Sequence, residues 1–136
     1  MIDEELKSMI LDHMEKGFLE NIIDMFKHDE SLFPLIIDML KDERMRVRLG
    51  ATALVEEMVK LKPESFVNLI PAIAALLKDE NSNVRGDGAN ILGIIGHKDA
   101  LPFLADVEND ADRDVREIAQ EAIENIQELK PSSLRI

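Results

Sequence analysis

The chain contains no cysteine, tryptophan or tyrosine in 136 residues, and five phenylalanines are its only aromatic side chains. Without cysteine, disulfides, thiolate catalysis and cysteine-ligated metal sites are excluded, and a reducing compartment is compatible. With so few aromatics, we expect a core of Ile, Leu, Val, Met and Ala, the usual residues of packed helices. The composition of 46% hydrophobic and 32% charged residues fits a folded domain and not a disordered chain.

Basic residues are also scarce, because 16 Lys and Arg face 28 Asp and Glu and leave a net charge of −12. Nucleic-acid binding depends on neutralising phosphates with Lys and Arg, and anionic membranes attract basic surfaces. We therefore expect neither nucleic acid nor membrane as a partner.

Long hydrophobic runs are absent from the sequence, which has no apolar stretch near the ~20 residues of a membrane span. The first residues, with Asp3, Glu4 and Glu5, do not resemble a secretory signal peptide. We expect a cytoplasmic protein.

One pattern is present three times. Each copy begins with a proline, has apolar residues two and five positions later and an aspartate eight positions later, and continues five residues further on with Val-Arg. The copies start at Pro34, Pro71 and Pro102 and are 37 and 31 residues apart. A period in this range is typical of stacked helical hairpins, which bury their apolar faces against one another.

Hydrophobic spacing predicts a helix over 2–16, ended by Gly17, and a second helix over 18–26. Each repeat then has a helix A that carries the proline and a helix B that follows the aspartate. The predicted A helices cover 31–41, 64–78 and 99–107, and the predicted B helices cover 45–61, 82–95 and 112–129. The fold class is therefore all-α, an α-solenoid of about four antiparallel helix pairs.

Local signals sharpen these boundaries. The prolines should kink the A helices or start their regular part. Asn81 and Asp112 stand where N-caps of B helices belong, while the first B helix has Arg44 there and needs another cap, for which Asp42 is the candidate. We predict one domain over 1–130, with an N-terminal capping pair (1–30), repeats over 31–62, 63–97 and 98–130, and a tail over 131–136.

The segment 84–96 resembles helix B of a HEAT repeat, and its ending Leu92-Gly93-Ile94-Ile95-Gly96 resembles the HEAT-like repeats of the bilin (phycocyanin) lyase type. The resemblance covers about residues 31–130. It implies a right-handed HEAT/armadillo-like solenoid with a concave face built from the B helices, used in most such proteins as a scaffold.

The resemblance also implies a structural ladder, in which Asp and Arg pair between neighbouring repeats and bond helix-end carbonyls. The matching residues are Asp42, Arg48, Asp79, Arg85, Asp110 and Arg116. A guanidinium can satisfy several of the carbonyls that a helix end leaves unpaired. The third repeat departs from the pattern with Glu108 where Leu40 and Leu77 stand, which indicates a polar outer layer or a contact with another chain.

Residues for catalysis are not apparent. His13, His28 and His97 are the only histidines, and no two are spaced to share a helix face. The chain lacks the His-Glu dipeptides of HEAT-like iron hydroxylases, and paired carboxylates are expected on the helix faces of so acidic a chain. We therefore expect solvated or capping histidines, no catalytic residue, no metal and no cofactor.

Three glycines in one predicted helix need an explanation, because each costs about 1 kcal/mol relative to alanine. Close packing of helices accounts for Gly88. Gly86 aligns with Leu49 and Glu117 on the outer face, so the approach of a partner's backbone is the alternative there.

The outward stripe of the B helices is the candidate interaction surface, and an ordinary solvated face is the alternative. Its centre comprises Leu49, Glu57, Asn90, Ile94, Glu117 and Glu121. We expect Leu49 and Ile94 to be exposed, Ile94 to be an apolar anchor, and the glutamates to favour a partner that carries Lys or Arg. A homodimer through the same face is a further alternative.

Charge is unevenly distributed, because residues 99–128 hold ten acidic and two basic residues, whereas 41–62 hold six basic and four acidic. This asymmetry can steer a basic partner or favour contact between copies. We predict a non-catalytic scaffold or adaptor that binds a protein or peptide. The alternative is a bilin-lyase-like chromophore lyase or isomerase, and nucleic-acid binding, as in HEAT-like DNA glycosylases, ranks third.

Overall fold

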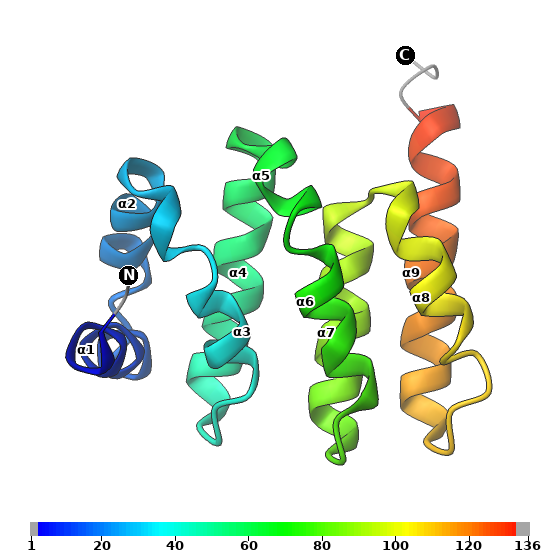
Figure 1. Cartoon of the computed structure of the whole chain (residues 1–136), viewed down its shortest axis with the longest axis horizontal. Helices are drawn as coiled ribbons and strands as arrows, with labels where there is room; N and C mark the ends of the chain where they lie inside the picture. The colour runs from blue at the N-terminus through cyan, green and yellow to red at the C-terminus, as the bar shows by residue number, and fades with distance from the viewer. Residues whose placement is uncertain (1–2, 133–136) are drawn as a thin grey trace. The chain divides into compact units, whose positions relative to one another are not determined.

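The computed structural model describes residues 3–132, and every regular element in that range is a helix (Figure 1). The all-α prediction is confirmed. The chain forms two compact units, Met1–Ser65 and Phe66–Ile136, which are described separately below. No helix in the described range is long and apolar enough to cross a bilayer.

The N-terminal unit contains four α-helices and one 3-10 turn. They are α1 (Glu4–Glu15), α2 (Leu19–His28), η1 (Glu30–Leu32), α3 (Leu35–Leu40) and α4 (Met45–Leu61). In Figure 1, α1 is seen end-on whereas α4 stands upright, so α1 lies across the helix that it contacts. Gly17 follows α1 with a φ of 92°, a left-handed conformation that glycine adopts without strain, and the predicted end is confirmed.

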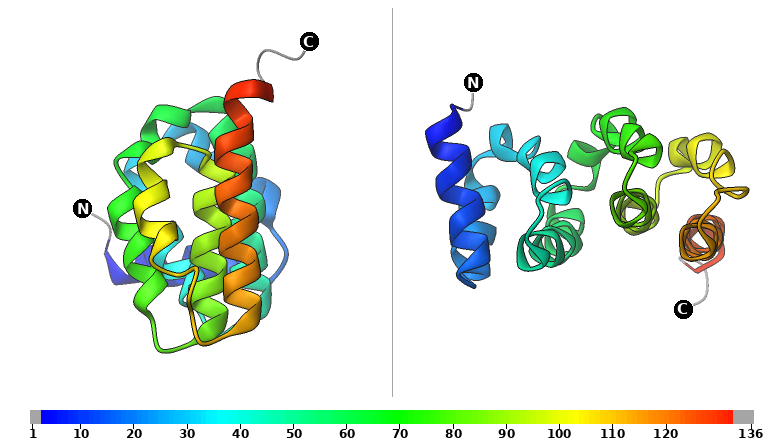
Figure 2. Two further views of the ribbon diagram at one scale, coloured as in Figure 1. Left: turned by 90° about the vertical axis from the view of Figure 1, so that its right-hand side faces the viewer. Right: turned by 90° about the horizontal axis from the view of Figure 1, so that it is seen from below.

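The C-terminal unit places its helices in two layers. Its elements are α6 (Ile70–Ala75), η2 (Leu76–Lys78), α7 (Ser82–Ile95), η3 (Lys98–Ala100), α8 (Leu101–Ala105) and α9 (Arg113–Ser132). Figure 2 shows α6 and α8 in one layer and α7 and α9 in the other. The short helix α5 (Pro63–Val67) spans the boundary between the two units.

The A helices are shorter than predicted, because proline interrupts each of them. The single helix predicted over 64–78 is divided into α5, α6 and η2. Pro71 has no N–H, and its ring would clash with the carbonyl four residues earlier, which belongs to Val67, the last residue of α5. Pro71 and Pro102 lie in the first turn of α6 and α8, so these prolines start the regular part of the helix.

The B helices agree closely with the prediction. α4 and α7 have the predicted bounds, and Gly96 ends α7 with a φ of 70°. α9 continues to Ser132, three residues past the predicted end. The predicted tail therefore begins inside α9, and its residues 133–136 lie outside the described range.

The predicted caps are confirmed for two of the three B helices. The side chain of Asn81 accepts a hydrogen bond from the backbone N–H of Asn83 (2.8 Å), and that of Asp112 accepts one from Asp114 (2.8 Å). For α4 the prediction was wrong. Asp42 accepts from the N–H of Arg44, the residue before the helix, and Arg44 provides no side-chain cap.

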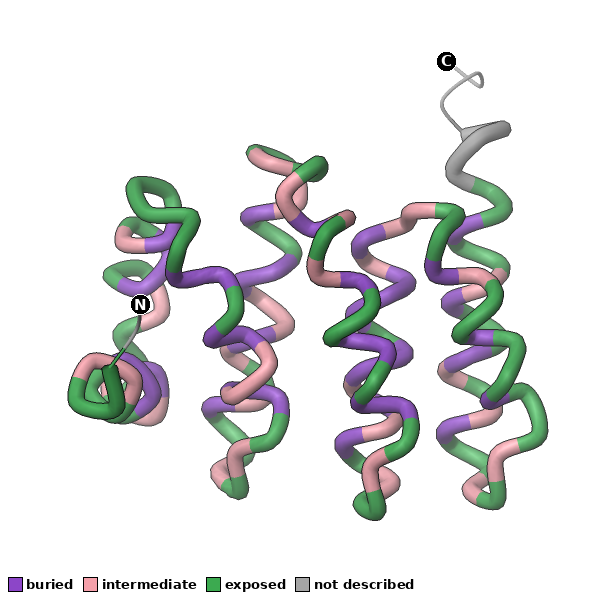
Figure 3. The backbone as a smooth tube through the Cα atoms, in the orientation of Figure 1, coloured by how far each residue is buried: buried purple, intermediate pink, exposed green. Residues whose placement is uncertain are grey.

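The core is apolar and mostly aliphatic, as predicted. Figure 3 shows where the buried residues lie along the chain. Phe26 is fully buried in the N-terminal unit and stacks on Phe33, with ring centroids 5.8 Å apart. In the C-terminal unit Ile73, Ile91 and Leu104 are fully buried between the layers. Burying such side chains stabilises the fold by about 1.5–3 kcal/mol each.

Close packing explains all three glycines of α7. A Cβ on Gly93 would lie 2.9 Å from the Cβ and 3.0 Å from the Cα of Ala122 in α9. On Gly86 it would lie 3.2 Å from Cδ1 of Ile118, and on Gly88 it would lie 3.1 Å from Cβ of Leu76. Gly86 is therefore buried against α9, and its predicted place on the outer face was wrong, because α9 approaches more closely than the alignment of repeats suggested.

We predict opposite outcomes for two alanine substitutions in α7. Gly93→Ala should lower the free energy of unfolding by about 1–2 kcal/mol, because the added carbon meets the backbone of Ala122 and overpacking exceeds the gain in helix propensity. Gly86→Ala should be neutral or stabilising by up to about 1 kcal/mol, because the end of the Ile118 side chain can move.

Urea unfolding followed by circular dichroism measures both, since the chain has no tryptophan or tyrosine for fluorescence. Equal effects of the two substitutions would contradict this account of the helix contact.

Candidate protein-interaction site

An aspartate shapes the turn between helix A and helix B in each repeat. Its carboxylate accepts a hydrogen bond from the backbone N–H two residues later. The bonded pairs are Asp42 with Arg44 (2.8 Å), Asp79 with Asn81 (2.9 Å) and Asp110 with Asp112 (2.9 Å). Because this contact is local, it fixes the direction in which the chain enters each B helix.

The arginine six residues after each aspartate lies in helix B, and its side chain hydrogen-bonds the same turn. Nη1 of Arg48, Arg85 and Arg116 donates to the carbonyl of the corresponding aspartate at 2.7, 2.9 and 2.7 Å. Arg48 and Arg85 also donate to the carbonyl of the following residue. These carbonyls precede a helix and need partners outside it.

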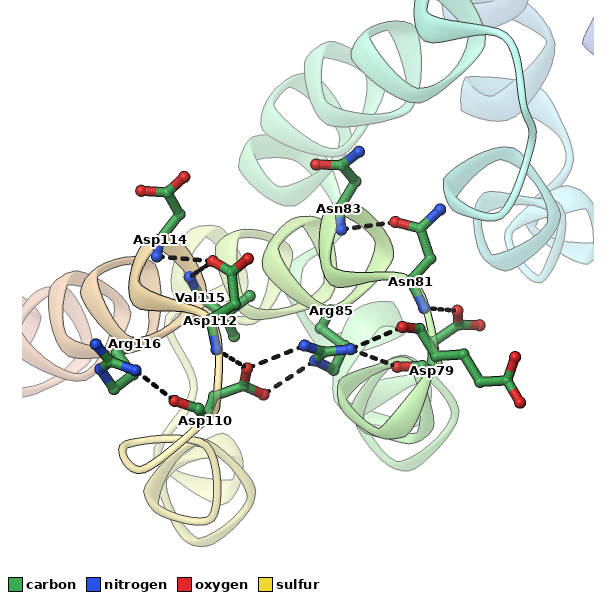
Figure 4. Close-up of polar contacts among 10 residues, drawn as sticks. Asp79, Asn81, Asn83, Arg85, Asp110, Asp112, Asp114, Val115 and Arg116 are labelled. Atoms are coloured by element: carbon green, nitrogen blue, oxygen red, sulfur yellow. Dashed lines mark hydrogen bonds and ion pairs between the residues drawn. The ribbon is translucent and has the colours of Figure 1, made fainter.

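One arginine also joins two repeats. Nε and Nη2 of Arg85 donate to the two carboxylate oxygens of Asp110, both at 3.0 Å, as Figure 4 shows. Both side chains are largely buried, with 16% and 10% of their surfaces exposed. The hydrogen bonds from Arg85 hold the pKa of Asp110 below its usual range, and the same contact raises the pKa of Arg85.

The N-terminal unit has a related ion pair that the repeat pattern did not predict. Arg44 donates through Nε to Asp42 (2.9 Å) and through Nη1 to Asp12 of α1 (2.8 Å). The hydrogen bond from Arg44 lowers the pKa of the Asp42 carboxyl. Nothing in the sequence signals this contact, because α1 lacks the repeat pattern and lies across α4.

The bonded turns leave a groove between the first halves of α7 and α9. Its volume is about 330 Å³, and its apolar surface comes from Gly86, Val115 and Ile118. Five carboxylates line it: Asp87, Asp112, Asp114, Glu117 and Glu121. Neither lysine nor arginine is among its lining residues in the described part of the chain.

The comparison with known families agrees with this arrangement. Residues 53–124, more than half of the chain, match the family model for HEAT repeats. The chain belongs to the HEAT-repeat family. No curated protein matches it.

In the C-terminal unit of this HEAT-repeat protein, two of the six predicted interface residues share the acidic groove. Glu117 and Glu121 line it. Glu117 also forms an exposed ion pair with Arg113, in which Nε of Arg113 donates to Oε1 of Glu117 (2.9 Å). Asn90 is exposed on α7. Ile94 is half-buried, so its predicted exposure was wrong.

The other two predicted residues lie on α4 in the N-terminal unit. Leu49 has 63% of its surface exposed. Glu57 lines a second groove, of about 350 Å³, between α2 and α4. The HEAT pattern missed the remaining acids of the first groove, Asp87, Asp112 and Asp114, because it marks positions that fold the repeat and not those that line its surface.

The histidines of the protein make local contacts. Nδ1 of His28 lies 2.8 Å from the carbonyl of Asp24, and Nδ1 of His97 accepts from the N–H of Asp99 (3.1 Å), which caps η3. For His28 and His97 the predicted solvated or capping character is confirmed. Within the described residues, no group of three His, Cys, Asp or Glu side chains is arranged to hold a metal ion.

We predict that Asp110→Asn lowers the free energy of unfolding at pH 7 by about 1–3 kcal/mol, the range for hydrogen bonds to charged groups. Because folding lowers the pKa of Asp110, its contribution is complete above the unfolded pKa of about 3.9 and is lost as pH falls through the folded value. The difference between wild type and variant should therefore persist from pH 7 to about 5 and shrink below about 4.

Urea titrations at several pH values, with Asp106→Asn as an exposed control of equal charge change, test this. A difference that stays constant down to pH 2 would contradict the proposed role of the carboxylate.

Proposed function

We propose that this HEAT-repeat protein is a non-catalytic scaffold or adaptor that binds a protein or peptide on its B-helix face, at α7 and α9 of the C-terminal unit. HEAT repeats are commonly protein-interaction scaffolds, which supports the general kind of function. The observation that carries the proposal is the groove between α7 and α9, in which five carboxylates surround a small apolar surface.

The chemistry of this groove favours a segment that carries Lys or Arg. The long apolar stems of these side chains can lie on half-buried Ile118 while their charged ends reach the carboxylates. A single exposed ion pair contributes only about 0.2–1 kcal/mol, so affinity requires several of them together. The field of the clustered carboxylates also accelerates the approach of a basic partner, and added salt weakens that effect.

Residues further along α7 can extend the contact. Asn90 and Ile94 follow Gly86 by one and two turns of the helix. Exposed Asn90 can hydrogen-bond a partner's backbone, and half-buried Ile94 offers a small apolar contact. A helix or an extended segment fits such a narrow surface better than a broad globular face.

The alternative, a bilin-lyase-type activity, depends on the ending Leu92-Gly93-Ile94-Ile95-Gly96. In the structure, Gly93 permits contact with Ala122, and Gly96 ends α7 in the left-handed conformation. Both glycines are therefore explained by folding. A visible absorption shift on mixing the purified protein with tetrapyrroles would favour the alternative, and we expect none.

We predict that Glu117→Gln combined with Glu121→Gln reduces capture of the protein's partner from an extract of the source organism at least tenfold. The matched control is Glu5→Gln combined with Glu64→Gln, which changes the net charge equally at exposed positions outside the groove. Quantitative mass spectrometry of the captured proteins at low and moderate salt measures the effect. Equal loss in both variants would indicate a general charge effect, and no loss in either would place the site elsewhere; both results contradict the proposal.

A further inference from the structure

Helix α4 exposes a short apolar stripe near its beginning. Met45 and Leu49, one turn apart, have 65% and 63% of their surfaces exposed. They are the two most exposed large hydrophobic residues of the described chain. Ala53, one further turn along the stripe, is small, is only half-buried, and lines the groove between α2 and α4.

The charges on the same helix are separated from one end to the other. Arg46 is exposed in the first turn, and Glu56 and Glu57 are exposed three turns later. The contacts of Arg46 and Glu57 are long: Arg46 donates to the carbonyl of Glu15 at 3.4 Å, and Glu57 lies 3.7 Å from Lys60 in an exposed pair. Such contacts are weak enough to be exchanged for a closer partner.

The charges and side-chain sizes along α4 are complementary to those of a second α4 that runs in the opposite direction. Arg46 and Glu56 lie symmetrically about position 51, and so do Leu49 and Ala53. Suppose that two copies of α4 pack antiparallel, with position 51 of both helices at the level of a two-fold axis. Leu49 of each copy then meets Ala53 of the other. Arg46 then faces Glu56 and Glu57 of the other copy, about 7–8 Å from the axis along the helix, at 1.5 Å per residue. A two-fold axis forms every such contact twice.

We propose that the protein forms a symmetric homodimer through antiparallel packing of α4 on α4 of a second copy. Large-to-small packing of Leu49 on Ala53 and two reciprocal Arg46–glutamate pairs fix the register. The flexible side chain of Met45 fills the edge of the contact. This surface is on the N-terminal unit and does not use the acidic groove of α7 and α9, so the dimer stands apart from the proposed partner site.

Charge exchange tests this register. Arg46→Glu in one protein and Glu56→Arg combined with Glu57→Arg in another should each abolish dimerisation, because like charges then face each other in both reciprocal pairs. In an equimolar mixture of the two proteins every pair is again of opposite charge. Sedimentation equilibrium over a range of concentrations should therefore show a wild-type dimer, two monomeric variants and a dimer in their mixture.

Apolar substitutions provide a second readout. Leu49→Ser should weaken the dimer at least tenfold, whereas Phe103→Ser, at an exposed position on α8, should leave it unchanged. Circular dichroism confirms that each variant remains folded. A wild-type chain that stays monomeric at all concentrations, a mixture that fails to dimerise, or a dimer insensitive to Leu49→Ser would overturn the proposal. A dimer that is lost in the Glu117→Gln, Glu121→Gln variant would overturn it as well, by locating the contact in the groove.

Discussion

The contact of Gly93 with Ala122 is the constraint on which the C-terminal unit depends. Gly93 has no side chain, so a neighbouring helix can approach α7 more closely there than a larger residue would allow. That neighbouring helix is α9. Each glycine reduces the intrinsic stability of α7, but the close approach increases dispersion contacts along both helices. The same approach buries Gly86 under Ile118 and so forms the floor of the acidic groove.

Hydrogen bonds at the turns determine where the two helices begin. Arg85 bonds the turn of its own repeat and the carboxylate of Asp110 in the next, so the starts of α7 and α9 are held together by one guanidinium. The caps Asn81 and Asp112 stand beside these bonds. As a result, acidic residues that follow each turn are brought to one place and line the same groove. The electrostatic character of the site is thus a consequence of how the repeats are joined.

Much of the fold follows from local signals in the sequence. The bounds of α7 were predictable, because Asn81 and Gly96 act within one turn of its ends. The A helices were predicted too long, since hydrophobic spacing continues through Pro71 although the backbone cannot. The burial of Gly86 was not predictable, because it depends on the distance to α9, which a comparison of repeats does not contain. Leu49 occupies the position equivalent to Gly86, yet one is exposed and the other buried.

The candidate site was predictable only in part, for a related reason. Glu117 and Glu121 were identified because they face outward on one helix, whereas Asp87 joins them only because α7 lies beside α9. The most direct test of the central claim is amide hydrogen exchange of the chain with and without its captured partner. Binding in the groove predicts slower exchange in segments 82–87 and 112–121. Slower exchange confined to α6 and α8, with these two segments unchanged, would contradict it.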